Sequence, residues 1–150
     1  SHFIFKHGKR KNYMKLESKI GKKVTKDEQI FNFLTDFDNF KSLVPQDKVK
    51  DWSSDENSCS FTVDPVGKTG FQIVDKEPSK LIKLTSIGQT QYSFTFWIQL
   101  KSLSDEETAI KLTMDVDINP MMAMMAKGPL KKFLDTLVDR MEQIDYSTNK

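Results

Sequence analysis

The residue types that carry most enzyme chemistry are scarce in this sequence. Its two histidines, His2 and His7, both lie within the first 13 residues, and Cys59 is the single cysteine. Histidine is the commonest general base and, with cysteine, the usual ligand of transition metals. The sequence therefore predicts no metal site, no cofactor and no intrachain disulfide. Cys59 itself is expected to be a small buried apolar residue rather than a reactive thiol.

Two patterns resemble catalytic motifs only superficially. Asp115 and Asp117 stand two residues apart on a predicted strand, so their carboxylates project to one face, where a pair could do acid–base chemistry. Because they alternate with Met114 and Val116, that face is expected to be the solvated outside of the sheet. Residues 67–69 (Gly-Lys-Thr) resemble the end of a phosphate-binding loop but lack its upstream glycine and its following helix. No catalytic residue is predicted.

Apolar and polar side chains alternate along most of the chain, which predicts strands. The expected strands cover residues 14–22, 49–52, 59–64, 69–75, 81–87, 91–103 and 108–118, with short turns between the later ones. Short connections favour antiparallel neighbours, so these strands should form a meander with one apolar face. In the first strand, Met14, Leu16, Ser18 and Ile20 are expected on the buried side.

Two short helices are expected between the first and second strands. The first has apolar residues at helical spacing within residues 27–34, and Thr25 stands three residues before Glu28, the spacing of a capping box. The second should begin at Asp36 or Asp38 and end by Pro45.

The C-terminal stretch, residues 119–146, predicts one long amphipathic helix around which the chain is organised. Asn119 is an acceptable N-cap, and Pro120 suits the first helical position. An apolar stripe runs from Leu130 to Ile144. Gly128-Pro129 should bend or interrupt the helix, because a proline has no N–H and clashes with the carbonyl four residues earlier.

Four methionines lie in the first turns of this helix, at positions 121, 122, 124 and 125. Their flexible side chains suit an adaptable cavity wall or mouth, a patch for a partner or a bilayer surface, or plain core packing. Four of six positions cannot all face one way, so at least one methionine should be exposed. We also hypothesise that the Gly-Pro break lets this segment tilt like a gate.

Composition limits the class of protein. A hydrophobic content of 37% and a charged content of 29% are typical of one folded domain, and a net charge of +2 is too small to imply nucleic acid. No run of about 18 apolar residues exists, so we expect no stable membrane insertion and, by default, a cytoplasmic protein. We expect a domain at 14–146, with residues 1–13 as a tag remnant or upstream basic leader, or less favourably a basic arm for an anionic surface. Residues 147–150 are expected to be a disordered tail, and the protein a monomer or weak dimer.

The order strand, two short helices, antiparallel meander and long C-terminal helix resembles the START-like superfamily, also called SRPBCC. The resemblance covers roughly residues 14–146 and rests on three stretches, which are 27–34 (DEQIFNFL), 40–45 (FKSLVP) and 127–130 (KGPL). These stretches mark a fold and not a reaction. The resemblance implies an α+β helix-grip fold, in which a curved antiparallel sheet wraps around the long C-terminal helix and encloses an elongated apolar cavity.

The expected function is non-catalytic binding or transport of a small hydrophobic ligand, which is lipid-, polyketide- or quinone-like. The side chains expected to line the cavity, unless they form a solid core, are Phe61, Val63, Phe71, Ile73, Phe94, Phe96, Ile98, Met114, Val116, Met122, Met125, Leu130, Phe133, Leu134 and Leu137. Trp52, Tyr92 and Trp97 are candidates for a polar handle at its rim. The alternatives are a polyketide cyclase- or aromatase-like enzyme, which needs a buried polar group in the cavity, and a protein-interaction module of the chaperone-cofactor kind.

Overall fold

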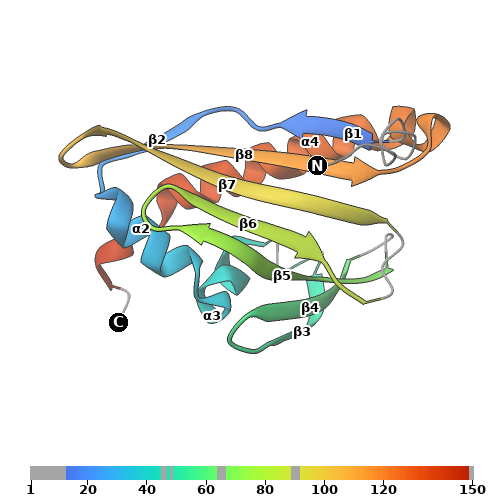
Figure 1. The fold of residues 1–150 in the computed structure, drawn as a ribbon, viewed down its shortest axis with the longest axis horizontal. Coiled ribbons are helices and arrows are strands. Elements are labelled where there is room, and N and C mark those ends of the chain that lie inside the picture. Colours follow the sequence, from blue (N-terminus) through green and yellow to red (C-terminus); the bar gives the residue numbers. More distant parts are fainter. Residues whose placement is uncertain (1–12, 45–46, 48, 64–66, 89–91, 149–150) are drawn as a thin grey trace.

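The curved antiparallel sheet and the long helix α4 (Pro120–Gln143) make up most of the molecule (Figure 1). A computed structural model describes residues 13–44, 47, 49–63, 67–88 and 92–148. Within these residues the sheet has eight strands, in the order β1-β8-β7-β6-β5-β4-β3, and β2 also pairs with β8. The strands are β1 (Tyr13–Glu17), β2 (Gly21–Lys23), β3 (Val49–Ser54), β4 (Ser58–Val63), β5 (Gly67–Glu77), β6 (Leu81–Ser86), β7 (Ser93–Ser104) and β8 (Glu107–Asp117). The predicted helix-grip fold is confirmed.

Alternation decides which side of each strand faces α4. In β7 and β8 the register pairs Phe96 with Met114 and Ile98 with Leu112, and these four side chains lie on the inner face. Asp115 pairs with Thr95 and Lys15 on the opposite, outer face, as its spacing predicts.

The first predicted strand, residues 14–22, is split into β1 and β2. The prediction that Ile20 lies on the buried side is wrong. The backbone of Ser18 donates to the Leu112 carbonyl, and its hydroxyl accepts from the Leu112 N–H, both at 2.9 Å. The chain then leaves the ladder towards α4, where the Lys19 N–H donates to the Asp135 carboxylate at 2.7 Å. This departure leaves Ile20 with 63% of its side chain exposed.

Helices α2 (Asp27–Leu34) and α3 (Phe37–Phe40) follow β2, and a 3₁₀ turn, η1 (Lys41–Leu43), continues α3. Asp36 caps α3, as expected, by accepting from the Asp38 N–H at 2.9 Å. The prediction of a capping box at Thr25 is wrong. Lys26 holds the N-cap position of α2, and the Thr25 carbonyl instead accepts from the Thr108 hydroxyl at 2.7 Å.

Helix α4 runs through Pro129, so Gly128-Pro129 does not interrupt it as one alternative of the prediction had it. Asn119 caps it, accepting from the Met122 N–H at 2.9 Å. Its buried residues, Leu134, Leu137, Val138 and Met141, all lie in its second half. None of the described helices is long and apolar enough to cross a membrane.

Part of the predicted C-terminal tail is helical. Tyr146 begins a 3₁₀ turn, η2 (Tyr146–Thr148), and its hydroxyl donates to the Met141 carbonyl at 2.8 Å. Residues 1–12 of the expected leader at 1–13, and residues 149–150, lie outside the described residues, and Tyr13 begins β1.

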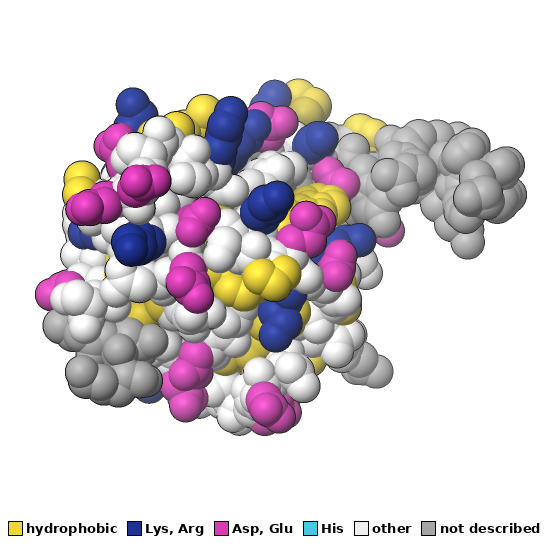
Figure 2. Space-filling view, turned by 60° about the vertical axis from the view of Figure 1, so that its left-hand side comes forward, with side chains coloured by type: hydrophobic (Ala, Val, Ile, Leu, Met, Phe, Trp, Pro, Cys, Tyr) yellow, Lys and Arg dark blue, Asp and Glu magenta, His cyan; other side chains and the backbone are white. Residues whose placement is uncertain are grey.

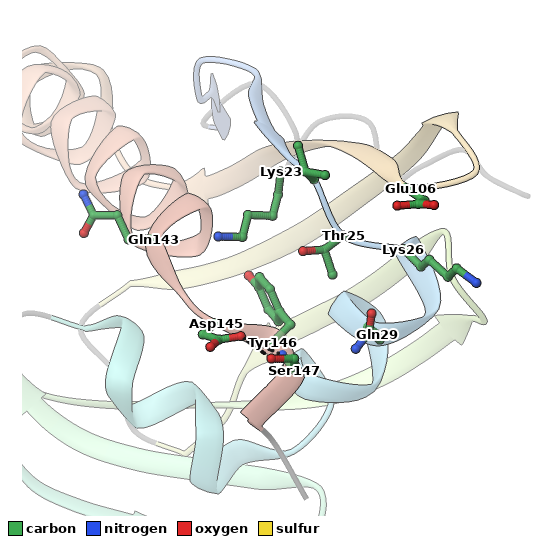
Figure 3. Close-up of a pocket in the computed structure, with 10 residues that line it drawn as sticks. Lys23, Thr25, Lys26, Gln29, Glu106, Gln143, Asp145, Tyr146 and Ser147 are labelled. Atoms are coloured by element: carbon green, nitrogen blue, oxygen red, sulfur yellow. Dashed lines mark hydrogen bonds between the residues drawn. The ribbon is translucent and has the colours of Figure 1, made fainter.

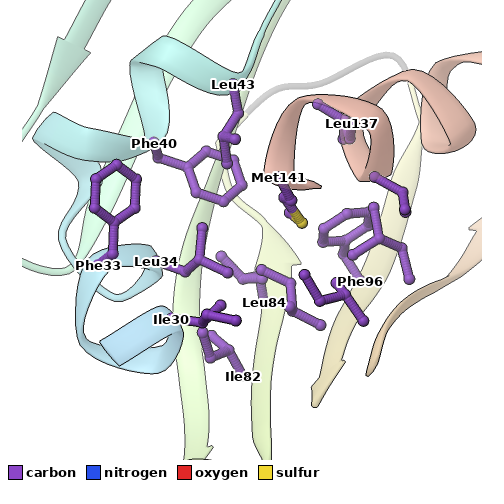
Figure 4. Close-up of a cluster of buried hydrophobic side chains, with 14 of the residues drawn as sticks. Ile30, Phe33, Leu34, Phe40, Leu43, Ile82, Leu84, Phe96, Leu137 and Met141 are labelled. Carbon is purple, nitrogen blue, oxygen red and sulfur yellow. The ribbon is translucent and has the colours of Figure 1, made fainter. Parts of the chain in front are cut away.

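The core joins α2, α3 and α4 across the inner face of the sheet. Figure 4 shows Leu34 and Phe40 reaching towards Leu84, while Leu137 and Met141 of α4 approach Phe96. On the face shown in Figure 2, acidic and basic side chains are interspersed, in keeping with the small net charge.

Candidate functional site

Aromatic side chains from three different parts of the chain meet on the inner face of the sheet. We define the aromatic cluster as Trp52 of β3, Phe61 of β4, Phe71 of β5, Phe94 of β7, and Phe37 and Phe40 of α3. Phe71 lies at its centre, with ring centroids 5.7 Å from Phe61, 6.3 Å from Phe94, 5.6 Å from Phe37 and 5.5 Å from Phe40. Such edge-to-face and tilted pairs stabilise packing by about 0.5–1.5 kcal/mol beyond area burial.

Trp52 ends this cluster with a polar atom that has no partner. Its indole stacks on Phe61 at a centroid distance of 5.2 Å and an interplanar angle of 13°. The indole Nε1 is buried without a hydrogen-bond acceptor, and no other side-chain N or O atom of the described residues is in that state. A buried donor without a hydrogen-bond partner costs about 1–3 kcal/mol, so such a group calls for an explanation.

The backbone of β3 directs Trp52 inward. The β3–β4 register shifts between Lys50 and Ser53, which marks a bulge, and Asp51 within it has φ of 56°. A β-bulge changes the direction of the neighbouring side chain, and aspartate is among the residues that tolerate the left-handed region. The orientation of Trp52 is therefore built by a local irregularity of the strand.

The predicted cavity-lining residues fall into several groups. Phe61, Phe71, Phe96, Ile98, Val116, Leu134 and Leu137 are buried, while Ile73, Phe94, Met114, Leu130 and Phe133 are partly buried and pack against the core. Met122 is half-buried, and Met125 is 70% exposed and so faces solvent. The Val63 side chain lies outside the described part of the structure.

The three candidates for a polar handle at the cavity rim lie in different environments. Trp52 joins the cluster, whereas Trp97 lies on the outer face, where the Lys83 ammonium sits 5.8 Å from its ring centroid. Tyr92 is half-buried just before β7. Sequence reasoning missed Phe37 and Phe40 as members of the aromatic cluster, although their spacing of three residues in a predicted helix was a usable signal.

Apart from the Trp52 indole, the buried polar side chains are few and already bonded. In the part of the chain that the structure describes, the buried polar side chains are Ser18, Thr108 and Thr113, and each has a hydrogen-bonded protein partner. Burial raises the pKa of the Cys59 thiol to about 12, and burial also raises the pKa of Tyr146 above its ordinary value. Neither group is poised to exchange a proton near neutral pH.

Two surface hollows lie away from the aromatic cluster. One, of about 390 Å³, sits between the start of α2 and the end of α4, with Lys23, Gln29 and Asp145 among its lining residues (Figure 3). The other, of about 510 Å³, is a groove between β1 and the first half of α4. Among the described residues no group of three His, Cys, Asp or Glu side chains is placed to hold a metal ion.

Comparison with known proteins supports the fold and leaves the activity open. No family model matches the chain, and no curated protein matches it in sequence. Among solved structures, a START superfamily protein from Mycobacterium smegmatis superposes with a TM-score of 0.63 at 15% identity, covering 89% of this chain and 99% of that one.

Two further structures are similar over most of the chain. A conserved protein from Geobacillus kaustophilus has a TM-score of 0.66 at 16% identity, covering 83% of this chain and 90% of that one. Norcoclaurine synthase from Thalictrum flavum, in complex with dopamine and hydroxybenzaldehyde, has a TM-score of 0.65 at 11% identity, covering 97% of this chain and 95% of that one. The protein therefore has the START-like helix-grip fold.

Proposed function

We propose that the protein binds a small, largely apolar molecule with one hydrogen-bond acceptor against the aromatic cluster, without transforming it. The observation that carries this proposal is the buried Nε1–H of Trp52, which has no acceptor within the protein. A ligand carbonyl, carboxylate or sulfonate at this position would supply one, and its apolar body would lie against Phe61, Phe71 and Phe94.

The burial of this set favours a site that is completed by a ligand. Trp52 and Phe94 are only partly buried although their rings contact the core, so part of each remains available to another apolar surface. Burying apolar area contributes roughly 25 cal/mol per Å² before ordering costs. In keeping with this, a structural neighbour, norcoclaurine synthase, was solved with two small aromatic molecules.

Binding is favoured over catalysis by the chemistry of the inner face. A cyclase- or aromatase-like reaction needs a positioned acid or base. The buried polar side chains in the described residues are serine and threonines engaged with protein partners, and the nearest buried ionisable group, Cys59, has its pKa raised to about 12. The buried residues of the described chain can therefore hold and orient a molecule, which favours binding.

A titration with 8-anilinonaphthalene-1-sulfonate tests this proposal. The fluorophore has apolar rings and a sulfonate acceptor, and we expect saturable one-to-one binding by the folded protein. Trp52→Phe keeps a ring on Phe61 but removes the N–H, so affinity should fall about tenfold or more, as for a lost hydrogen bond to a charged group. Trp97→Phe, on the outer face, is the matched control and should bind as the wild type does.

Native mass spectrometry of the protein purified from its host complements this titration, because a co-purifying molecule would reveal the natural ligand class. Failure of the fluorophore to saturate, or equal affinities of the Trp52→Phe and Trp97→Phe variants, would overturn the proposal.

A further inference from the structure

The first half of α4 has one side that the rest of the described protein does not cover. Every buried residue of α4 lies between Leu134 and Met141, and none lies between Pro120 and Pro129. Met121, Met124 and Met125 are 74%, 83% and 70% exposed. Three large apolar side chains on neighbouring positions of one helix end form a patch rather than scattered surface residues. We call these three side chains the methionine patch.

Lysines outnumber acidic side chains around the methionine patch. Residues 118–134 contain Lys127, Lys131 and Lys132 and no aspartate or glutamate, and of these lysines Lys131 pairs with Asp135 at 2.9 Å. The groove of about 510 Å³ beside the patch adds Lys15 and has one acidic side chain, Glu17, whose carboxylate pairs with Lys111 at 2.8 Å.

Exposed apolar side chains flanked by lysines match the two layers of an anionic membrane surface. Apolar side chains of a surface helix enter the boundary between headgroups and acyl chains, while lysines contact the anionic headgroups. Methionine suits this role because its unbranched, flexible side chain adapts to an irregular apolar environment. The groove between β1 and α4 places Lys15 and Lys127 around one hollow beside Met124, where a headgroup phosphate would meet two ammonium groups.

We propose that the methionine patch and its lysines dock the protein reversibly on the surface of a bilayer rich in anionic phospholipid. The docked helix end would lie in the interface without spanning it. This inference does not depend on the ligand proposed above, since the aromatic cluster belongs to β3, β4, β5, β7 and α3 and shares no residue with the patch.

Co-sedimentation with vesicles tests the docking. Wild-type protein is expected to pellet with vesicles of phosphatidylcholine and phosphatidylglycerol, to pellet little with phosphatidylcholine alone, and to be released by high salt. Combining Met121→Ser, Met124→Ser and Met125→Ser should weaken binding at least tenfold. Lys127→Gln and Lys132→Gln should each weaken it about fivefold, the factor that corresponds to ~1 kcal/mol per lysine near an anionic surface.

Matched controls separate this surface from general stickiness. Val24→Ser and Val74→Ser alter side chains that are 75% and 47% exposed but lie away from the patch, and both should bind vesicles like the wild type. Trp52→Phe should also bind vesicles normally, so that failure of the ligand proposal and failure of docking are distinguishable. Absence of binding to anionic vesicles, or equal binding to both vesicle types, would overturn the proposal. So would a dimer in lipid-free solution that the methionine substitutions abolish, because the occupant would then be a second copy.

Discussion

Gly21 in β2 lies directly against Val138 in α4, with no room for a side chain between them. A Cβ built on Gly21 would stand 2.5 Å from Cγ1 of Val138 and 3.0 Å from the Glu142 carboxylate. The Glu142 carboxylate also accepts from the Lys22 N–H at 2.8 Å. The segment between β1 and β2 and the strand β2 therefore hold the second half of α4 on the sheet at van der Waals distance.

Gly21→Ala is expected to lower the free energy of unfolding by about 1–3 kcal/mol, the usual cost of overpacking a core. The reason is that Val138 is fully buried and cannot swing aside. Urea denaturation measures the change. Gly128→Ala is the control, because a Cβ there meets nothing within 4 Å and alanine favours the helix by up to about 1 kcal/mol. If Gly21→Ala were as stable as the wild type, the contact between Gly21 and Val138 would have room for a methyl group.

Asp135→Asn should destabilise the protein in a pH-dependent way. Burial raises the pKa of the Asp135 carboxyl, but hydrogen bonds from the Lys131 ammonium and the Lys19 N–H lower it by more, so the pKa lies below its ordinary value. A lowered carboxyl pKa stabilises the fold above the unfolded pKa of about 3.9, and this stabilisation is lost as pH falls through the folded pKa.

The partly exposed position of Asp135 keeps the expected effect small, about 0.5–1 kcal/mol at pH 7. Denaturation curves of wild type and Asp135→Asn should converge below pH 4. A stability difference that stays constant from pH 7 to pH 3 would mean that the stabilisation does not come from the charge of the Asp135 carboxylate.

The Cys59 thiol is expected to resist alkylation and disulfide exchange in the native protein. Burial raises its pKa to about 12, and only 2% of the residue is exposed. The thiolate is the reactive form, so reaction with Ellman's reagent at pH 8 should be slower than that of an ordinary thiol by roughly a thousandfold. The same protein in guanidinium chloride serves as control and should release one equivalent of thionitrobenzoate rapidly. Comparable rates in both states would place Cys59 outside the core.

Amide exchange should differ between the two halves of α4. Amides of residues 121–125 are expected to exchange faster than those of residues 134–141, because only the second half packs into the core and Pro129 offers no N–H to the Met125 carbonyl. Hydrogen–deuterium exchange with peptide resolution measures this. Equally slow exchange in both halves would argue against a first half that moves separately, and thus against the gate hypothesis.

The sequence predicts most strands well because alternation reports directly on a half-buried sheet. The expected strand at 108–118 corresponds to β8 at Glu107–Asp117, and residues 81–87 to β6 at Leu81–Ser86. The same rule fails at Ile20, because the hydrogen bonds of Ser18 and Lys19 to distant residues draw the chain out of the ladder. Interactions across more than 90 positions, such as Lys19 with Asp135, leave no local pattern.

The candidate site was predictable in part for the same reason. Period two places Phe61, Phe71 and Phe94 on the inner face, and the structure puts them in one cluster. What alternation cannot show is which helix covers them, so Phe37 and Phe40 of α3 were missed. The unpartnered Nε1 of Trp52 depends on a bulge at Asp51, which only the strand register reveals.

The most direct test of the ligand site is the indole N–H signal of Trp52 in a ¹H–¹⁵N spectrum. The chain has two tryptophans, so two indole cross-peaks are expected, and Trp97→Phe assigns them. On saturation with 8-anilinonaphthalene-1-sulfonate, the Trp52 cross-peak should shift as its N–H gains an acceptor, while the Trp97 cross-peak on the outer face stays in place. An unmoved Trp52 cross-peak, with the fluorophore bound, would contradict a ligand site at the aromatic cluster.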